Sequence, residues 1–334
     1  MDAPRPLPAL VYLDATAVEA SMPPLEVRLA LADRTMRALV ADAELPPKIG
    51  VHPRPANSFA HAMPAWLRGG ADDAGADLLG LKWVTGFPAN RAAGRPAIHA
   101  TIVLNDPATG VPTAILDGSP ITAHRTAAVS GVALRHWCPA VPGRPLRAAI
   151  VGAGVQAHSH LPVLGAVLPG VTVAVHDRHE ERAATVVDAA ATTPGIGGAT
   201  VARSAGEAVG EADVVITGIS FGPVRQTMGP DSFQGHATIV AIDYDMCCSA
   251  AVASQADLFL VDERAQFLAV QATGPFAGYP VPAATIGEAL AAGTHRPPGR
   301  VLVTHLGVGL ADAIFAAAIT RRARELGLGT VLPR

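Results

Sequence analysis

The pattern of apolar and polar positions divides the chain near residue 143. Before this point, a short apolar run at 10–13 precedes a helical segment rich in Ala, Leu and Arg, and a Pro- and Gly-rich stretch with strand-like pieces follows at 45–75. A helix is predicted at 121–137. Between the last two segments lie three short β-type runs, which predict a meander or small mixed sheet: 78–87, 98–106 and 112–118.

After residue 143, continuous apolar runs alternate with helical segments. A strand at 148–151 leads through a glycine turn into a helix at 155–167, and a second strand at 171–177 precedes a helix at 179–191. This alternation predicts an α/β domain, with a parallel sheet covered on both faces. The chain ends in a long Ala-rich helix at 307–326. Further apolar runs expected in the parallel sheet are 200–204, 213–219, 239–244 and 257–262.

Composition narrows the class of protein. A length of 334 residues predicts two domains. Half of the residues are apolar and the net charge is −3, so nucleic acid and anionic membranes are not expected partners. No apolar run reaches the roughly 20 residues of a membrane span, and the N-terminus lacks the pattern of a signal peptide. Three cysteines, two of them adjacent, indicate neither a disulfide framework nor a zinc site, so we expect a cytoplasmic protein without a metal.

A dinucleotide fingerprint follows the first strand of the α/β region. Gly152, Gly154 and Ala157 occupy the fixed positions of a G-x-G-x-x-A motif, with Val155 and Gln156 opening the helix. The first glycine permits a tight turn, the second lets the backbone approach a pyrophosphate, and the alanine allows close packing. The free N–H groups of the helix N-terminus then bind phosphate.

The second strand ends in Asp177, where a carboxylate accepts hydrogen bonds from the adenosine ribose hydroxyls. A carboxylate there repels a 2′-phosphate and favours NAD. Arg178 and Arg182 would tolerate that phosphate, which keeps NADP as the alternative. Thr217, in the apolar run 213–219, is a further expected contact of the cofactor.

Three motifs outside this region carry a resemblance: GLKWVTGFPAN at 80–90, LDG at 116–118 with ITAHRTAA at 121–128, and HAMPA at 61–65. Together with the fingerprint, they resemble the ornithine cyclodeaminase/mu-crystallin family over about residues 45 to 326.

The resemblance implies a homodimer and a Rossmann domain inserted into a smaller α+β domain. The substrate-binding and dimerisation domain is then formed by 1–128 and 306–334, and the dinucleotide-binding domain by 129–305. It also implies an enzyme, an NAD(P)-dependent oxidoreductase or cyclodeaminase.

Matching motifs assign roles by the same resemblance. Lys82 corresponds to the catalytic lysine, Arg125 to the arginine that binds the substrate carboxylate, and Lys48 to a second carboxylate-binding cation. Asp245 corresponds to the acid that holds the substrate amine, and Thr126 to a phosphate contact. These residue types suit oxidation of an amine, which needs a fixed carboxylate and a group that moves a proton.

Two departures from the family concern the substrate. His61 stands where cyclodeaminases have a glutamate for the distal amine, and with Met63 it is expected to line the substrate site. The segment after Asp245 reads Met-Cys-Cys-Ser-Ala in place of a Pro-Gly-Lys-like sequence. Both differences count against ornithine. His305 and Asp312, near the start of the final helix, are secondary candidates.

The sequence therefore predicts an NAD-dependent oxidoreductase acting on the Cα amine or imine of a small amino or imino acid. One alternative is a cyclodeaminase that forms a cyclic amino acid with catalytic NAD. The other is a mu-crystallin-like protein that binds a dinucleotide and a ligand without turnover.

Overall fold

The computed structural model describes residues 7–69 and 76–334. The first six residues, part of the segment examined for a signal peptide, and residues 70–75 of the Pro- and Gly-rich stretch lie outside the described residues. The chain divides into two compact units. Unit 1 comprises 1–125 and 308–334, and unit 2 comprises 126–307. The sequence placed these divisions at 128/129 and 305/306.

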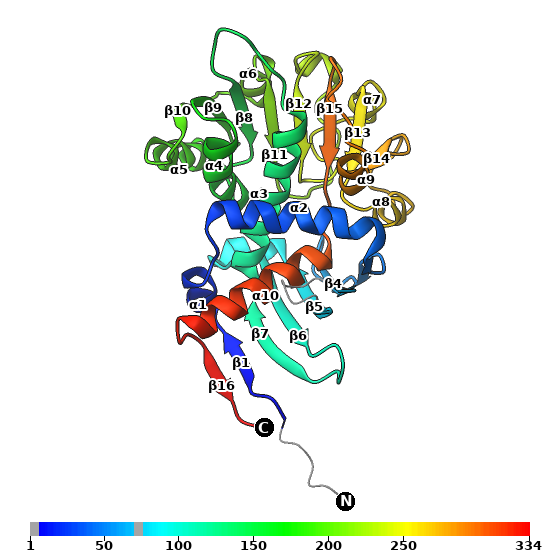
Figure 1. The fold of residues 1–334 in the computed structure, drawn as a ribbon. Coiled ribbons are helices and arrows are strands. Elements are labelled where there is room, and N and C mark those ends of the chain that lie inside the picture. Colours follow the sequence, from blue (N-terminus) through cyan, green and yellow to red (C-terminus); the bar gives the residue numbers. More distant parts are fainter. Residues whose placement is uncertain (1–6, 70–75) are drawn as a thin grey trace, which may run out of the picture. The chain divides into compact units, whose positions relative to one another are not determined.

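Unit 1 contains a mixed eight-stranded sheet in the order β16-β1-β7-β6-β5-β4-β2, with β3 paired to β4, among the described residues (Figure 1). β4 to β7 form an antiparallel meander, β1 is parallel to β7, and β16 is antiparallel to β1. The strands are β1 (Leu10–Leu13), β2 (Ala43–Glu44), β3 (Ile49–Val51), β4 (Phe59–Leu67), β5 (Leu78–Gly86), β6 (Ile98–Asn105), β7 (Pro112–Asp117) and β16 (Thr330–Leu332).

The Pro- and Gly-rich stretch contains a nine-residue strand, β4, which the sequence indicated only as strand-like pieces. Pro64 lies within it and pairs with Leu81 of β5 on one side. On the other side, β3 pairs with residues 60–62 and β2 with residues 66–67, so Pro64 lies opposite the gap between these two short strands. A proline is tolerated there because no ladder hydrogen bond from its nitrogen is needed.

Helix α10 covers one face of this sheet and contacts β4, β5, β6 and α2. Two glycines allow its close approach. A Cβ on Gly80 of β5 would lie 3.0 Å from the Cβ of Ala313, and one on Gly309 would lie 2.3 Å from the carbonyl oxygen of Met63. The helices of unit 1 are α1 (Ala15–Ala20), α2 (Leu25–Ala41), the 3-10 helix η1 (Pro88–Ala93) and α10 (Gly309–Glu325), and α3 (Gly118–Trp137) begins in unit 1 and continues into unit 2.

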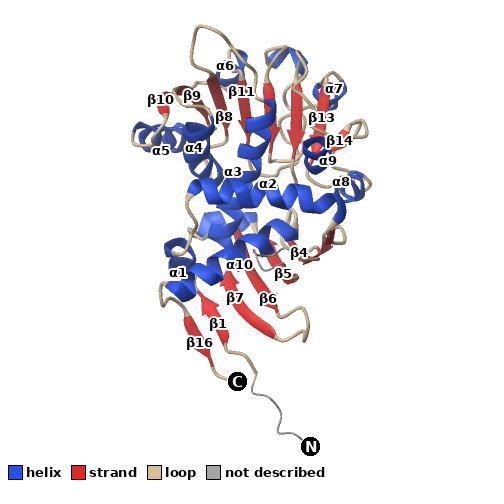
Figure 2. Ribbon diagram, in the orientation of Figure 1, coloured by secondary structure: helices blue, strands red, loops and turns tan. Residues whose placement is uncertain are grey.

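Unit 2 contains a parallel eight-stranded sheet in the order β10-β9-β8-β11-β12-β15-β13-β14 within its described residues. Helices flank these strands (Figure 2), and the strands β11, β12, β13 and β15 are buried along their whole length. The strands are β8 (Arg147–Val151), β9 (Val171–His176), β10 (Ile196–Val201), β11 (Val214–Thr217), β12 (Thr238–Ala241), β13 (Leu258–Val261), β14 (Ala284–Thr285) and β15 (Val301–Thr304).

The predicted α/β class with a Rossmann-type parallel sheet is confirmed. The sequence did not identify β14, β15 or the helices between them and β12, because these elements are short and some lie in Pro- and Gly-rich surroundings. The helices of unit 2 are α4 (Val155–Val167), α5 (Glu180–Ala191), α6 (Ala205–Gly210), η2 (Pro230–Ser232), α7 (Ala250–Ser254), α8 (Arg264–Gln271) and α9 (Ile286–Ala291).

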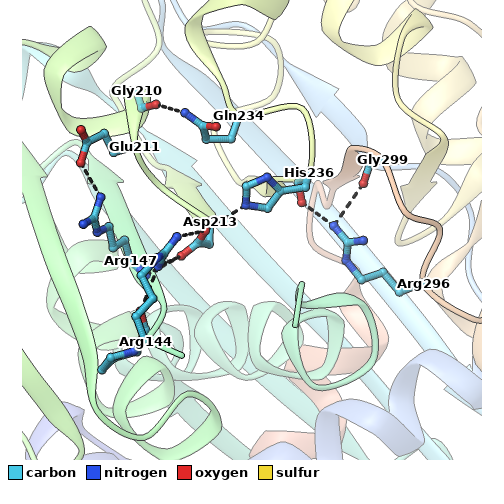
Figure 3. Close-up of polar contacts among 10 residues, drawn as sticks. Arg144, Arg147, Gly210, Glu211, Asp213, Gln234, His236, Arg296 and Gly299 are labelled. Atoms are coloured by element: carbon cyan, nitrogen blue, oxygen red, sulfur yellow. Dashed lines mark hydrogen bonds and ion pairs between the residues drawn. The ribbon is translucent and has the colours of Figure 1, made fainter. Parts of the chain in front are cut away.

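A buried carboxylate joins the strands at the amino-terminal edge of the parallel sheet (Figure 3). Asp213, directly before β11, accepts two hydrogen bonds from the Arg144 guanidinium, at 2.7 and 2.9 Å, and one from the backbone N–H of Arg147, at 2.8 Å. His236 Nε2 lies 2.9 Å from its other oxygen. Burial raises the pKa of Asp213, but the bonds from Arg144 and His236 outweigh this and hold it at about 2.

We expect Asp213→Asn to destabilise the protein by about 1.5–3 kcal/mol, the contribution of hydrogen bonds to a charged group. Because the pKa is depressed, this contribution is present above the ordinary value of 3.8 and is lost as the pH falls toward 2. Urea unfolding at pH 7 and pH 3 measures both effects. Glu211→Gln is the matched control, since Glu211 pairs with Arg147 at an exposed position and such pairs contribute under about 1 kcal/mol. Equal midpoints for the two variants would contradict the assignment.

Candidate active site

A lysine is buried in the sheet of unit 1. Lys82 is 2% exposed and lies at the centre of β5, opposite Met63 of β4 and Ile102 of β6. Side chains alternate between the two faces of a strand, so Lys82 shares its face with Gly80, which α10 approaches. Its neighbour Trp83 lies on the other face and is 45% exposed. The alternation therefore directs the lysine into the core beneath α10.

Four polar side chains from three elements meet at this position. Lys82 Nζ donates to Asp312 Oδ1 at 2.9 Å and to Thr122 Oγ1 at 2.6 Å. Arg125 Nε donates to the same oxygen of Asp312 at 3.1 Å. Thr122 and Arg125 lie three residues apart on α3, hence on one face, while Asp312 lies in the first turn of α10. We call Lys82, Thr122, Arg125 and Asp312 the lysine cluster.

Burial and charge set the protonation of this cluster. Burial lowers the pKa of Lys82, Asp312 raises it, and Arg125 and Lys48 lower it further, which leaves the pKa at about 8. Burial raises the pKa of Asp312, but the charges of Arg125 and Lys82 outweigh this and lower it. Asp312 is therefore ionised at neutral pH, and Lys82 can exchange a proton near physiological pH.

One oxygen of the cluster has no partner. Asp312 is fully buried, and its Oδ1 accepts from both cations, whereas its Oδ2 forms no hydrogen bond with any described residue. The two terminal nitrogens of Arg125 also form no hydrogen bond within the described part of the chain. The cluster thus offers a buried acceptor and a guanidinium edge to a ligand.

Lys48 and His61 belong to the same neighbourhood. The charge of Lys48 acts on both His61 and Lys82, which places these three groups close together. Burial lowers the pKa of His61, and Lys48 and His52 lower it further, to about 4. The imidazole stacks on Phe59 with ring centroids 4.6 Å apart. His61 is therefore neutral at pH 7. It shares its face of β4 with Met63, by the alternation along the strand.

The dinucleotide turn in unit 2 has the geometry that its motif requires. Gly152 has φ of 102°, and a Cβ there would lie 2.6 Å from the carbonyl oxygen of Gly218, so only glycine fits. Around Gly154, the space for a Cβ is open. Gly154 caps α4 without a side-chain hydrogen bond, and Val155 is 70% exposed. Ala157 is buried. These residues fit a pyrophosphate at the helix N-terminus.

Asp177 lies beside this turn, and its carboxylate accepts hydrogen bonds from the backbone N–H groups of Ala153 and His179, at 2.8 and 2.9 Å. The acid is thus held next to the turn, as recognition of a ribose requires. Arg178 is exposed and donates to His179.

Other predicted cofactor contacts have partners within unit 2. The hydroxyl of Thr217 is buried and donates to Asp243 at 2.8 Å. The backbone oxygen of Gln156 accepts from His160, and that of Thr126 lies 3.3 Å from Ser130 Oγ. Contact of Thr126, Gln156 and Thr217 with a cofactor stays a prediction.

Asp245 lies in unit 2 and has two partners there. Its Oδ1 accepts from Arg225 Nη1 at 2.5 Å, and its Oδ2 accepts from the backbone N–H of Phe276 at 2.9 Å. Both oxygens therefore have protein partners. Arg225, which the sequence analysis did not single out, comes from the loop between β11 and η2.

A buried hydrogen-bond chain positions His305 after β15. His160 Nδ1 contacts the carbonyl oxygen of Gln156, so it carries the proton, and burial lowers the pKa of His160 to about 4. Nε2 of the neutral His160 therefore accepts from Ser130 Oγ at 2.8 Å. Ser130 Oγ in turn accepts from His305 Nε2 at 3.0 Å. The chain fixes the tautomer of His305.

Among the described residues, no helix has the length and apolarity needed to cross a membrane. Within the same residues, no group of three or more His, Cys, Asp or Glu side chains is arranged to hold a metal ion.

Residues 15–221 match the ornithine cyclodeaminase/mu-crystallin family. The chain belongs to this family. It is 29% identical to nodulation efficiency protein NfeD of Rhizobium meliloti over 86% of its own length and 87% of that protein. A Δ1-pyrroline-2-carboxylate reductase of Bacillus cereus is 36% identical, over 43% of each chain.

The fold also matches a solved structure of this class. Thermococcus litoralis Δ1-pyrroline-2-carboxylate reductase, determined with NADH and L-proline, gives a TM-score of 0.82 at 24% identity, over 96% of this chain and 100% of the other. This likeness confirms the fold.

Within the family, sequence reasoning ranked Asp312 below Asp245 and passed over Thr122. The signal for Thr122 was available, because it stands three residues before Arg125 in ITAHRTAA. The pairing of Asp312 with Lys82 spans 230 residues, and no local pattern could show it.

Lys48 and Lys82 are the only lysines in the chain, which allows a direct measurement of the pKa. In protein labelled with 13C and 15N at lysine, we expect the Lys82 side-chain signal to titrate near pH 8, against an ordinary value of 10.5. It is protonated below that pH and neutral above it. Lys48→Arg removes the other signal and assigns the spectrum. A midpoint for Lys82 near 10.5 would show that burial and the neighbouring cations do not control its charge.

Proposed function

We propose that the protein is an NAD-dependent oxidoreductase that acts on the Cα amine or imine of a small amino or imino acid. The observation that carries this proposal is the lysine cluster, where a buried lysine with a pKa near 8 lies beside an arginine that has its terminal nitrogens available. Unit 2 supplies a turn that fits a dinucleotide. NAD, when bound, supplies the hydride acceptor or donor for Cα.

Residues of the lysine cluster, together with Lys48, have separate roles in the proposed reaction. Arg125 binds the substrate carboxylate through its guanidinium edge, since planar carboxylates and guanidinium groups form paired hydrogen bonds. Lys48 adds a second positive charge. Lys82 takes a proton from the substrate nitrogen during oxidation and returns one during reduction, as a group with pKa near 8 can do at neutral pH. The relative bound to NADH and L-proline supports a substrate of this chemical class.

The cofactor preference follows from Asp177. Its carboxylate is fixed beside the glycine turn by two backbone N–H groups, and a fixed negative charge disfavours the 2′-phosphate of NADP. Arg178 is the nearest cation in sequence, and it would have to overcome this repulsion for NADP to bind better.

We also propose that the protein is a homodimer, through the face of the unit 1 sheet opposite to α10. By the strand register, Ile49, Val51 and Trp83 share this face, and they are 61%, 60% and 45% exposed. Exposed apolar side chains gathered on one face of a sheet indicate an interface. The three cysteines are free thiols, which supports a reducing compartment such as the cytoplasm.

The function is tested by incubating the protein with NAD⁺ or NADP⁺ and a panel of amino acids. We expect net NADH formation, followed by absorbance at 340 nm, and a preference for NAD⁺. Release of ammonia without net NADH would identify a cyclodeaminase, in which the hydride returns to the cyclic imine. Tight cofactor binding without either signal would identify a binding protein of the mu-crystallin type.

His61 determines how well a distal amine is accepted. Its low pKa leaves it neutral at pH 7, and a neutral group cannot offset the cost of burying an ammonium. Ornithine and lysine should therefore be poor substrates. We expect His61→Glu to raise kcat/KM for ornithine at least about 10-fold, since one charged hydrogen bond contributes about 1.5–3 kcal/mol. His61→Gln, which is uncharged, should give no such gain. Efficient conversion of ornithine to proline by the native protein would refute this assignment.

A further inference from the structure

We propose that Oδ2 of Asp312 binds the nitrogen on Cα of the substrate. This inference rests on the proposed function, because it assumes an amino or imino acid. It is carried by the one buried oxygen of the lysine cluster that has no partner. Oδ1 of the same carboxylate accepts from Lys82 at 2.9 Å and Arg125 at 3.1 Å, while Oδ2 accepts from none of the described residues.

A buried carboxylate oxygen without a donor is unusual, because buried polar atoms are nearly always hydrogen-bonded. Asp312 is fully buried and ionised, so it can only accept hydrogen bonds. The missing partner is therefore an N–H or O–H group. An amine, an ammonium and a protonated imine all present N–H donors, so the contact can persist through oxidation or reduction of the Cα–N bond.

The position of Asp312 relative to Arg125 favours an α-amino acid. Arg125 uses only Nε to bind Asp312, which leaves its terminal nitrogens for a carboxylate. The two recognition groups are thus adjacent, as are the carboxylate and the nitrogen carried by one Cα. A nitrogen held at Oδ2 also lies beside the carboxylate that binds Lys82, so the lysine is within reach of its proton.

The family resemblance assigned this contact to Asp245, each of whose oxygens has a partner within unit 2. One of its oxygens accepts from Arg225 at 2.5 Å and the other from the Phe276 N–H at 2.9 Å. Asp245 already has a cation and a backbone donor, whereas Asp312 has an unused oxygen in a cluster that also contains the carboxylate-binding arginine.

The test compares ligands that differ only in the nitrogen. Isothermal titration of the protein saturated with NADH measures the dissociation constants of L-alanine and propanoate, and of L-phenylalanine and 3-phenylpropanoate. NADH prevents turnover of the amino acids. We expect each amino acid to bind about 10- to 150-fold more tightly than its deamino partner, as one charge-assisted hydrogen bond implies.

In Asp312→Asn this preference should fall to near 1, because the amide can present a donor where the carboxylate presented an acceptor. Asp245→Asn should retain the preference. Asp312→Asn leaves Lys82 without its counter-charge, so a second comparison starts from a protein without this lysine. Lys82→Met should keep the preference for the amino acid over its deamino partner. The double variant Lys82→Met/Asp312→Asn should lose that preference. When Arg125→Ala is added to any of these variants, it should weaken the binding of the amino acid and of its deamino partner by the same factor.

The outcomes separate the two proposals. If the native protein prefers the amino acid and the Asp312 variants keep that preference, or if only Asp245→Asn loses it, the assignment to Asp312 is wrong while the proposed function stands. If the native protein binds neither member of any pair, the proposed function fails and the assignment fails with it.

Discussion

The burial of the Lys82 ammonium is the constraint on which the rest of unit 1 depends. A charge inside a sheet-and-helix core is costly unless it is paired and hydrogen-bonded. Asp312 and Thr122 provide that pairing, at 2.9 and 2.6 Å. The positive charge is only partly neutralised, because the lysine cluster contains one carboxylate, Asp312, for the two cations Lys82 and Arg125, and Lys48 lies nearby. Burial, together with Arg125 and Lys48, lowers the pKa of Lys82, and the excess of positive charge attracts an anionic ligand.

The fold meets this constraint through small residues. Gly80 and Gly309 let α10 approach the sheet closely enough for its first turn to contact the lysine. Asp312 in that turn is also near the positive end of the α10 dipole, which favours its ionised form. The packing that stabilises unit 1 is thus the same packing that sets the charge of its reactive groups.

Much of the fold was accessible from the sequence, because its signals are local. The apolar runs of β8 and β9 and the glycines at 152 and 154 identify the parallel sheet and its dinucleotide turn within a few dozen residues. β4 was harder to predict from the sequence, because a proline such as Pro64 counts against a strand. Only the structure shows that Pro64 lies opposite the gap between β2 and β3, where a proline is tolerated. In the site, Lys82 and Arg125 were found through their motifs. The unpaired oxygen of Asp312 and the engagement of Asp245 by Arg225 depend on side-chain geometry, which no sequence pattern encodes.

The division of unit 1 into two segments has a consequence for biosynthesis. Residues 1–125 are made first, residues 126–307 follow, and α10 is made last. While the ribosome synthesises unit 2, the sheet face around Lys82 has neither its covering helix nor its counter-ion. Domains generally fold as units as they emerge, so unit 2 can become compact during translation, whereas unit 1 can be completed only once Asp312 has been added. The nascent chain therefore carries a half-finished sheet with an uncompensated lysine for the time needed to translate more than half of the protein.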